Sequence, residues 1–263
     1  MGFARLNPTY PVTTTLMPQP ALLQSAAELL AAILSGHRPA DAAQGRASVA
    51  GGRKPGAAKQ METHFRAHRE LGMRDRGLVA ETVYACLRYK RLLEHCLPQS
   101  HHGAFDLVAA QWIRDGMSAR AVADAGYRGD AAALAGCLRT LKTTELPFAV
   151  RASVPDWLAE RLLAHYGETE AEALTSALNQ AATTDLRVNT LKGKRDEAQA
   201  KLAAEDIATE PTPYSPIGLR RRERTPLFRT ATFKDGWFEV QDEGSQLLAL
   251  LVEPRRGEMV VDF

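Results

Sequence analysis

The first half of the chain places its apolar residues at the three- and four-residue spacing of amphipathic helices. In ALLQSAAELLAAIL, residues 21–34, the leucines share one face, and Gly36 ends the run. The same spacing occupies three further segments, residues 71–97, 107–114 and 131–141. Residues 45–59 are rich in Gly, Ala, Arg and Lys, show no periodicity and are expected to form a mobile loop. The pattern predicts an all-helical domain over residues 21–150, preceded by a flexible leader, residues 1–20.

Residues 151–235 change from helical to mixed periodicity. The segment SVPDWLAERLLAHYG predicts a helix with Ser153 as its cap and with Trp157 and Tyr166 on its buried face. TTDLRVNTLK then alternates apolar and polar residues, which is the period of a strand with one buried face. A helical pattern in KRDEAQAKLAAEDI and a short strand after the Pro-rich EPTPYSPIG complete the segment. This order predicts a small α+β module.

The last segment, residues 236–263, has the pattern of a strand, a helix and a second strand. GWFEV is strand-like, and QDEGSQLLALLV is a helix whose polar residues cluster at its N-terminal end, where backbone N–H groups are unpaired. EMVVDF is a short apolar run with the form of the first buried strand of a parallel α/β sheet. Ligands of such sheets bind outside the carboxyl ends of the strands, so the residues after Asp262 are expected to form a cofactor-binding loop.

Composition places the chain among folded proteins without a membrane anchor. Its 263 residues are 45% hydrophobic and 24% charged. The longest apolar stretches, residues 29–34 and 247–252, are far shorter than the roughly 20 residues that span a bilayer. The first residues also lack the apolar core of a secretory signal. We therefore expect a cytoplasmic protein with no membrane partner.

Positive charge is concentrated in one region, although the net charge is only +2. Between Arg46 and Arg91, eleven Lys or Arg residues stand against four acidic residues, a local excess of seven positive charges. A second basic run, LRRRER, covers residues 219–224. Such a concentration fits a polyanionic partner, because Lys and Arg that contact phosphates release counterions. A solvated helix face explains the same charges equally well, and charge alone leaves both interpretations open.

Cysteine and histidine spacing predicts neither a metal site nor a redox pair. Cys86, Cys96 and Cys137 are too scattered for a CxxC motif, and apolar neighbours, as in VYACLRY, favour buried structural thiols. EHCLPQSHH matches no standard zinc spacing, and HFRAH lacks the Glu of a zinc protease. A polar helix end and a solvated helix face explain these two segments better than a metal does.

Three motifs together resemble one protein family. LRVNTLK, GWFEVQDEGSQLLALLV and GEMVVDF stand in the order and spacing of the RsmB/Sun/NOP family of RNA cytosine-C5 methyltransferases. The segment LGMRDRGLVAETVYACLRY is similar to the NusB-like RNA-binding domain of the RsmB branch of that family. The resemblance implies a NusB-like all-α domain (21–150), an RRM-like α+β module (151–235) and the start of a Rossmann-type α/β methyltransferase domain (236–263) that is cut off after its first strand.

The resemblance also implies the chemistry of a complete enzyme. Family members transfer a methyl group from S-adenosylmethionine to cytosine C5 after a cysteine thiolate adds to C6. The family's cysteines stand in Pro-Cys and Thr-Cys contexts beyond the cofactor loop, and none of the three cysteines here does, so no catalytic residue is carried over. Asp262 would lie beside the methionine moiety of the cofactor. The chain alone is not expected to bind S-adenosylmethionine.

RNA contacts are expected from two groups of residues. The basic helical segment supplies the first group, which is Arg74, Arg76, Arg88, Lys90 and Arg91. The resemblance places the LRVN strand and the QDEGSQL helix near the RNA, which adds Arg187, Asn189, Lys192, Gln241, Asp242 and Ser245. A hydrogen bond at the strand end is an equal alternative for Asn189. A helix cap explains Asp242 without any ligand.

Two functions from different classes follow from these observations. The first is the N-terminal RNA-binding part of a ribosomal RNA cytosine-C5 methyltransferase of the 16S type, without its catalytic core. Such a chain would be a fragment of a longer enzyme or the product of a truncated gene, and the fragment is favoured. The second is a stand-alone NusB-like module that binds RNA or protein without enzymatic activity. In either case the expected partner is RNA, ribosomal RNA above all, and the expected state is a monomer.

Overall fold

The computed structural model describes residues 19–35, 55–98, 100, 102–180, 182–221 and 227–261. The chain divides into two compact units, Met1–Gln180 and Ala181–Phe263. Within the described residues, none of the helices is long and apolar enough to cross a membrane. This division falls after residue 180, and the domain boundaries predicted at residues 150 and 235 remain predictions.

The first unit is helical, as the spacing of its apolar residues predicts. Its α-helices are α1 (Pro20–Ser35), α2 (Ala57–Ala67), α3 (Met73–Arg88), α4 (Lys90–His95), α5 (Ala104–Arg114), α6 (Ala119–Asp124), α7 (Ala131–Thr140), α8 (Phe148–Arg151) and α9 (Asp156–Leu178), with a 3₁₀ turn, η2, at Thr143–Glu145. The expected loop over residues 45–59 is wrong at its end, because α2 already begins at Ala57. Residues 1–18 and 36–54, which include most of the predicted leader and loop, lie outside the described residues.

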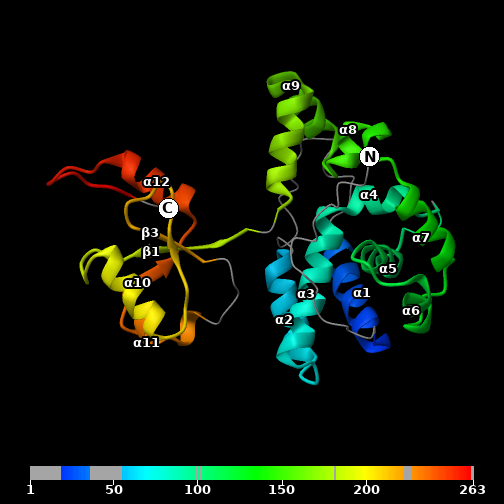
Figure 1. The fold of residues 1–263 in the computed structure, drawn as a ribbon, viewed down its shortest axis with the longest axis horizontal. Helices are drawn as coiled ribbons and strands as arrows, with labels where there is room; N and C mark the ends of the chain where they lie inside the picture. The colour runs from blue at the N-terminus through cyan, green and yellow to red at the C-terminus, as the bar shows by residue number, and fades with distance from the viewer. Residues whose placement is uncertain are drawn as a thin grey trace, which may run out of the picture. The chain divides into compact units, whose positions relative to one another are not determined.

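Helix α5 is the centre of this unit. It contacts α1, α3, α4, α6 and α7, and Figure 1 shows it nearly end-on among its neighbours. Its successive residues Leu107, Val108, Ala109 and Ala110 are all fully buried, which is the behaviour of a helix that is apolar on every side. The indole Nε1 of Trp112 donates a hydrogen bond of 3.1 Å to Thr82 Oγ1 on α3, so the one polar group of this large side chain is satisfied inside the core.

Helix α9 corrects three details of the sequence analysis. Ser153 does not cap it: the residue has a left-handed backbone (φ 56°), and its hydroxyl accepts a hydrogen bond from the Arg91 amide at 3.0 Å. Pro155 occupies the N-cap position without a side-chain cap. Trp157 and Tyr166 are exposed rather than buried. Helical spacing shows which residues share a face, but it does not show whether another element covers that face, and here α8 covers only part of the helix.

The second unit is a small α+β fold. Its elements are β1 (Thr184–Val188), α10 (Arg195–Ala204), β2 (Glu210–Pro211), β3 (Gly218–Arg221), η3 (Leu227–Arg229), α11 (Ala231–Lys234), β4 (Phe238–Val240) and α12 (Glu243–Val252). The strands form one antiparallel sheet in the order β2-β3-β1-β4. The predicted strands around LRVN and GWFEV are confirmed. They are direct neighbours, because β4 pairs with β1.

Alternation along β1 gives the sheet two different faces. Leu186 and Val188 point into an apolar cluster with Ala198 and Leu202 of α10. Asp185 immediately precedes Leu186 and points to the other face, where it accepts a hydrogen bond from the amide of Glu243 at the start of α12. The beginnings of α10 and α12 therefore lie on opposite sides of β1.

The predicted buried strand over residues 258–263 is wrong for residues 258–261. These residues are exposed and form no strand. Val260 and Val261 have no parallel neighbour strand among the described residues, so their apolar side chains have nothing to pack against. Asp262 and Phe263 lie outside the described residues.

Candidate functional site

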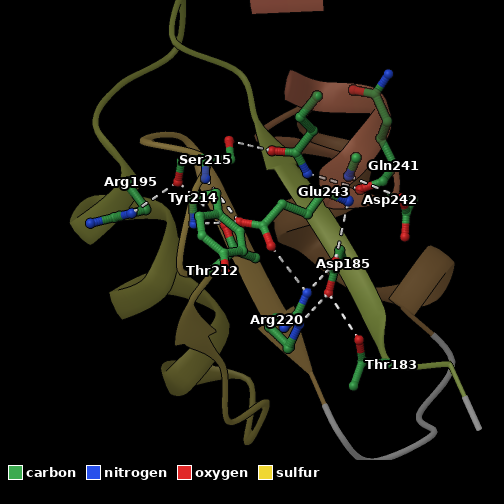
Figure 2. A network of polar contacts seen from close by, with 12 residues as sticks. Thr183, Asp185, Arg195, Thr212, Tyr214, Ser215, Arg220, Gln241, Asp242 and Glu243 are labelled. Carbon is green, nitrogen blue, oxygen red and sulfur yellow. Dashed lines mark hydrogen bonds and ion pairs between the residues drawn. The ribbon is translucent and has the colours of Figure 1, made fainter. Parts of the chain in front are cut away.

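A cluster of buried charges joins three elements of the second unit. The guanidinium of Arg220 on β3 donates to both carboxylate oxygens of Asp185 on β1, from Nε and from Nη2, each at 2.8 Å. The same Nη2 lies 3.3 Å from Oε2 of Glu243, the first residue of α12. The side chains of Asp185 and Glu243 are only 2% and 8% exposed. One arginine thus connects two buried carboxylates from different elements, as Figure 2 shows.

Glu243 extends the cluster into the Pro-rich loop before β3. Its Oε1 accepts hydrogen bonds from the backbone amides of Tyr214 at 2.7 Å and Ser215 at 2.8 Å. The hydroxyl of Ser215 donates to Oε1 of Gln246 at 2.7 Å, and Gln246 Nε2 donates to the Gln241 carbonyl oxygen at 2.8 Å. The start of α12, the sheet and the loop are therefore held together by one continuous network (Figure 2).

Both carboxylates in the cluster are ionised at neutral pH. The hydrogen bonds from Arg220 lower the pKa of Asp185, although burial opposes the shift, and the Glu243 amide adds to the lowering. Burial raises the pKa of Glu243, but hydrogen bonds from the Ser215 and Tyr214 amides outweigh it, so the net shift is downward. Arg220 gains the complementary upward shift in pKa from its bond to Asp185. Groups that hold their charges this firmly organise structure; they do not exchange protons near pH 7.

The predicted residues at the start of α12 lie beside this cluster. Asp242 is the N-cap, and its carboxylate accepts a hydrogen bond from the Gly244 amide at 3.0 Å, so the cap interpretation is confirmed. Ser245 is exposed on the first turn of the helix. Gln241 is half-buried, and its Oε1 is buried without a hydrogen-bond partner among the described residues. That amide oxygen is the one orphaned acceptor at this helix start in the part of the chain that the structure describes.

Asn189 is used within the fold at the end of β1. Its Nδ2 donates to the Gly236 carbonyl oxygen at 2.9 Å, and its Oδ1 accepts from the Leu191 amide at 3.1 Å. The strand-end hydrogen bond weighed in the sequence analysis is confirmed. Arg187 is half-exposed opposite Glu239 of β4, and Lys192 is exposed.

The basic residues of the first unit differ in their availability. Arg76 donates to the carbonyl oxygens of Leu71 and His68 at 2.8 and 3.3 Å, and Lys90 forms an ion pair with Glu94. These two side chains are therefore occupied by contacts inside the unit.

Arg91 is occupied as well. Its Nη1 donates to the Val154 carbonyl oxygen at 2.6 Å and to Asp156 Oδ1 at 2.8 Å, which ties α4 to the start of α9. Arg74 is exposed and Arg88 is half-buried, and neither side chain has a hydrogen bond or ion pair with another described residue. The structure thus distributes the five predicted basic residues between internal ties and available charges.

The sequence analysis missed Asp185, Arg220 and Glu243. Asp185 carried a usable signal, because an acid inside an alternating strand stands on the face opposite Leu186 and requires a partner there. Arg220 was noticed only as part of a basic run, and Glu243 only as part of a motif. No local spacing connects them, since Asp185 and Arg220 are 35 residues apart in the chain.

Neither a metal centre nor a reactive thiol emerges from the described residues. Among them, no three His, Cys, Asp or Glu side chains come together in a way that could hold a metal ion. Burial raises the pKa of the Cys86 thiol. Burial, together with a hydrogen bond to the neighbouring Cys137, raises the pKa of the Cys96 thiol. Such thiols are protonated and unreactive, in agreement with structural roles.

Comparisons with known proteins find a family match within the second half of the chain. Residues 154–227 match the family model described as Methyltr_RsmF/B-like, ferredoxin-like domain. A solved structure, "Crystal Structure of PH0851", aligns with 93% of this chain and 58% of its own with a TM-score of 0.56. At 16% identity that likeness shows the fold alone.

Similar curated proteins carry one name. A protein of Synechocystis sp., "Probable ribosomal RNA small subunit methyltransferase B", is 35% identical over 42% of this chain and 25% of its own length. A protein of the same name from Bacillus subtilis is 26% identical over 73% of this chain and 50% of its own length. A "Ribosomal RNA small subunit methyltransferase B" of Sodalis glossinidius is 36% identical over 41% and 25%. The chain spans about a quarter to a half of the length of these relatives, and over that part the similarity supports the RsmB/Sun family.

Proposed function

We propose that the chain is the N-terminal, RNA-binding part of an S-adenosylmethionine-dependent methyltransferase that acts on cytosine C5 of small-subunit ribosomal RNA. The observation that carries the proposal is the match of residues 154–227 to the RsmF/B-like ferredoxin-like domain, together with the names of the relatives. The antiparallel sheet of the second unit is a fold of the kind that this description names. A NusB-like role for the helical unit and a cytoplasmic location belong to the same proposal.

The proposal assigns cofactor binding to residues outside the described sheet. That sheet is antiparallel throughout, whereas a nucleotide-type cofactor of this class is held by loops at the carboxyl ends of parallel strands. We propose that S-adenosylmethionine is used by a longer polypeptide, in which Asp262 lies beside its methionine moiety. The contribution of this chain is to bind and orient the RNA.

Of the basic residues predicted to contact RNA, we propose first those that have no internal hydrogen bond or ion pair among the described residues. They are Arg74, Arg88, Arg187 and Lys192. Gln241, Asp242 and Ser245 form a second, polar group at the start of α12. Arg76, Lys90, Arg91 and Asn189 support the fold in which these groups are presented.

A charge-removal series tests the RNA interface. Arg74→Gln and Arg88→Gln are each expected to weaken binding of single-stranded ribosomal RNA fragments and to reduce the slope of log affinity against log salt by about 0.7. Arg91→Gln is the matched control, because it removes the same charge from a residue held by Val154 and Asp156, and it should lower thermal stability instead. Fluorescence anisotropy at several salt concentrations measures the slopes. Equal slopes in all four proteins would contradict the assignment of Arg74 and Arg88.

A methyl-transfer experiment tests the enzymatic part. The 263-residue polypeptide is expected to show no saturable binding of S-adenosylmethionine by calorimetry and no transfer of tritiated methyl groups to ribosomal RNA. A longer polypeptide, in which the remaining residues of the Bacillus subtilis relative are joined to this chain, is expected to do both. Saturable cofactor binding by the 263 residues alone would show that the site has been misplaced.

The small antiparallel sheet is also compatible with a second candidate, a stand-alone module that binds RNA or protein without catalysis. The two candidates differ in one observable. If the joined polypeptide methylates RNA only when residues 19–261 are present and intact, the module serves an enzyme. If the module binds RNA tightly but deleting residues 19–261 from the joined polypeptide leaves methylation unchanged, the module acts alone. We propose that the longer polypeptide is a monomer.

A further inference from the structure

The Pro-rich loop between β2 and β3, residues 212–217, is held in place by hydrogen bonds to the buried Glu243. Glu243 accepts hydrogen bonds from two successive loop amides, those of Tyr214 and Ser215. The loop closes on itself where the Thr212 amide donates to the Gly218 carbonyl oxygen at 3.1 Å. A Cβ atom at Gly218 would come within 2.1 Å of the Thr212 hydroxyl oxygen, so glycine is required for this closure.

The rigid loop presents an aromatic ring to solvent. Tyr214 is 75% exposed although its own amide is fixed by the buried Glu243. Pro213 and Pro216 flank it and restrict the backbone on both sides. An exposed ring on a backbone that is already ordered loses little conformational entropy when it binds a partner.

An arginine lies against the same loop with unused hydrogen-bonding capacity. Arg195, the first residue of α10, donates from Nη1 to the Ser215 carbonyl oxygen at 3.4 Å, the long end of the hydrogen-bond range. Its Nε is buried and has no hydrogen-bond partner among the described residues, so a ligand can be reached only through the terminal N–H groups. Figure 2 shows Arg195 and Tyr214 at this loop. A guanidinium carries several more N–H donors than this one bond uses.

We propose that Tyr214 is a stacking platform for one base of single-stranded RNA, with the Arg195 guanidinium contacting an adjacent phosphate. Single-stranded RNA is bound through unstacked bases that lie on aromatic side chains, while Arg matches the phosphate oxygens. The inference rests on the proposed RNA-binding function and adds the residues that hold a nucleotide in the second unit. Neither residue belongs to the basic segment or to the motifs that carried the family resemblance.

The experiment uses the whole 263-residue chain and a fluorescein-labelled single-stranded ribosomal RNA fragment of about 16 nucleotides. Tyr214→Ala is expected to weaken binding by about tenfold to a hundredfold, with an unchanged salt slope, because stacking is not an ionic contact. Tyr214→Phe should keep the wild-type affinity. Arg195→Gln should lower the salt slope by about 0.7. Tyr166→Ala, which removes an exposed tyrosine from α9, is the matched control and should change nothing.

The outcomes separate this inference from the proposed function. If the wild-type chain binds the RNA and Tyr214→Ala binds it equally well, the stacking role is overturned while RNA binding stands. A loss in Tyr214→Phe equal to that in Tyr214→Ala would also overturn it, because the ring is retained in the former. If the wild-type chain does not bind the fragment at any salt concentration, the proposed function itself fails. Circular dichroism of each variant verifies that the side-chain changes leave the fold intact.

Discussion

Arg220→Met is expected to lower the free energy of unfolding of the second unit by about 3–5 kcal/mol, the cost of leaving buried charges without their partner. Methionine fills most of the space of the arginine stem but cannot donate to Asp185 or Glu243. Both carboxylates would then remain buried on the sheet without their shared cation. The loop amides still hold Glu243, so Asp185 bears most of the loss.

Hydrogen exchange measured by mass spectrometry resolves this loss within the full chain. Peptides that cover β1 and β4 should exchange much faster in the variant, while peptides from α5 in the other unit serve as an internal reference. Arg187→Met is the matched control, because it removes the same charge from the neighbouring strand β1 at a half-exposed position. If the two variants exchange alike, the cluster contributes no more than a surface charge and the expectation is wrong.

Acid provides a second test of the same cluster. The pKa values of Asp185 and Glu243 are lowered in the folded state, so their ionised forms stabilise the fold above their ordinary pKa values of 3.8 and 4.5. That stability is lost as pH falls through the lowered values. The wild-type unit should therefore weaken progressively below about pH 4. In Arg220→Met, protonation relieves the buried charges, so the difference in stability between variant and wild type should shrink over the same range.

The cluster of Asp185, Arg220 and Glu243 fixes the positions of two separate sequence motifs relative to each other. Asp185 precedes the LRVN motif, and Glu243 lies within QDEGSQL. Arg220 and the loop amides join them, so the two motifs are fixed relative to each other before any RNA is present. This preorganisation places the start of α12 and the Tyr214 loop on one rigid body.

Local patterns predicted the parts of the structure that local physics determines. The Asp242 cap and the strands around LRVN and GWFEV follow from side-chain chemistry and from period-two alternation, and all three are present. The pairing of β4 with β1 could not be predicted in this way. It depends on contacts between residues about fifty positions apart, which no short window of sequence contains.

The errors in the sequence analysis share another physical cause. Trp157 and Val260 have apolar side chains at positions where the period predicts burial, yet both are exposed. Burial requires a second surface, and the chain's own periodicity carries no information about it. The same limit applies to charge: Arg74 and Arg91 are equivalent in the sequence, but only Arg91 is tied to Val154 and Asp156.

The uncovered apolar face of α12 is expected to make the 263-residue polypeptide self-associate. Leu248 and Leu251 are 66% and 78% exposed, and Val252 lies next to them at helical spacing. The exposed Met259 and Val260 add apolar surface beyond the helix. A contiguous apolar patch of this kind on a folded protein favours association. Burying the two leucines contributes about 3–6 kcal/mol in total, so Leu248→Glu with Leu251→Glu should weaken association by roughly a hundredfold to ten-thousandfold.

Sedimentation velocity over a hundredfold range of concentration measures this association. The wild-type polypeptide should shift to larger species as concentration rises, and the double variant should stay monomeric. Leu178→Glu with Leu191→Glu is the matched control, since it also replaces two leucines, 70% and 95% exposed, that belong to α9 and to the turn after β1, and it should leave the association unchanged. A wild-type polypeptide that sediments as a monomer at every concentration would contradict the expectation. If association disappears only in the α12 variant, two leucines on one turn of helix are enough to hold two copies together. The proposed monomer then requires that another part of a longer polypeptide covers this face.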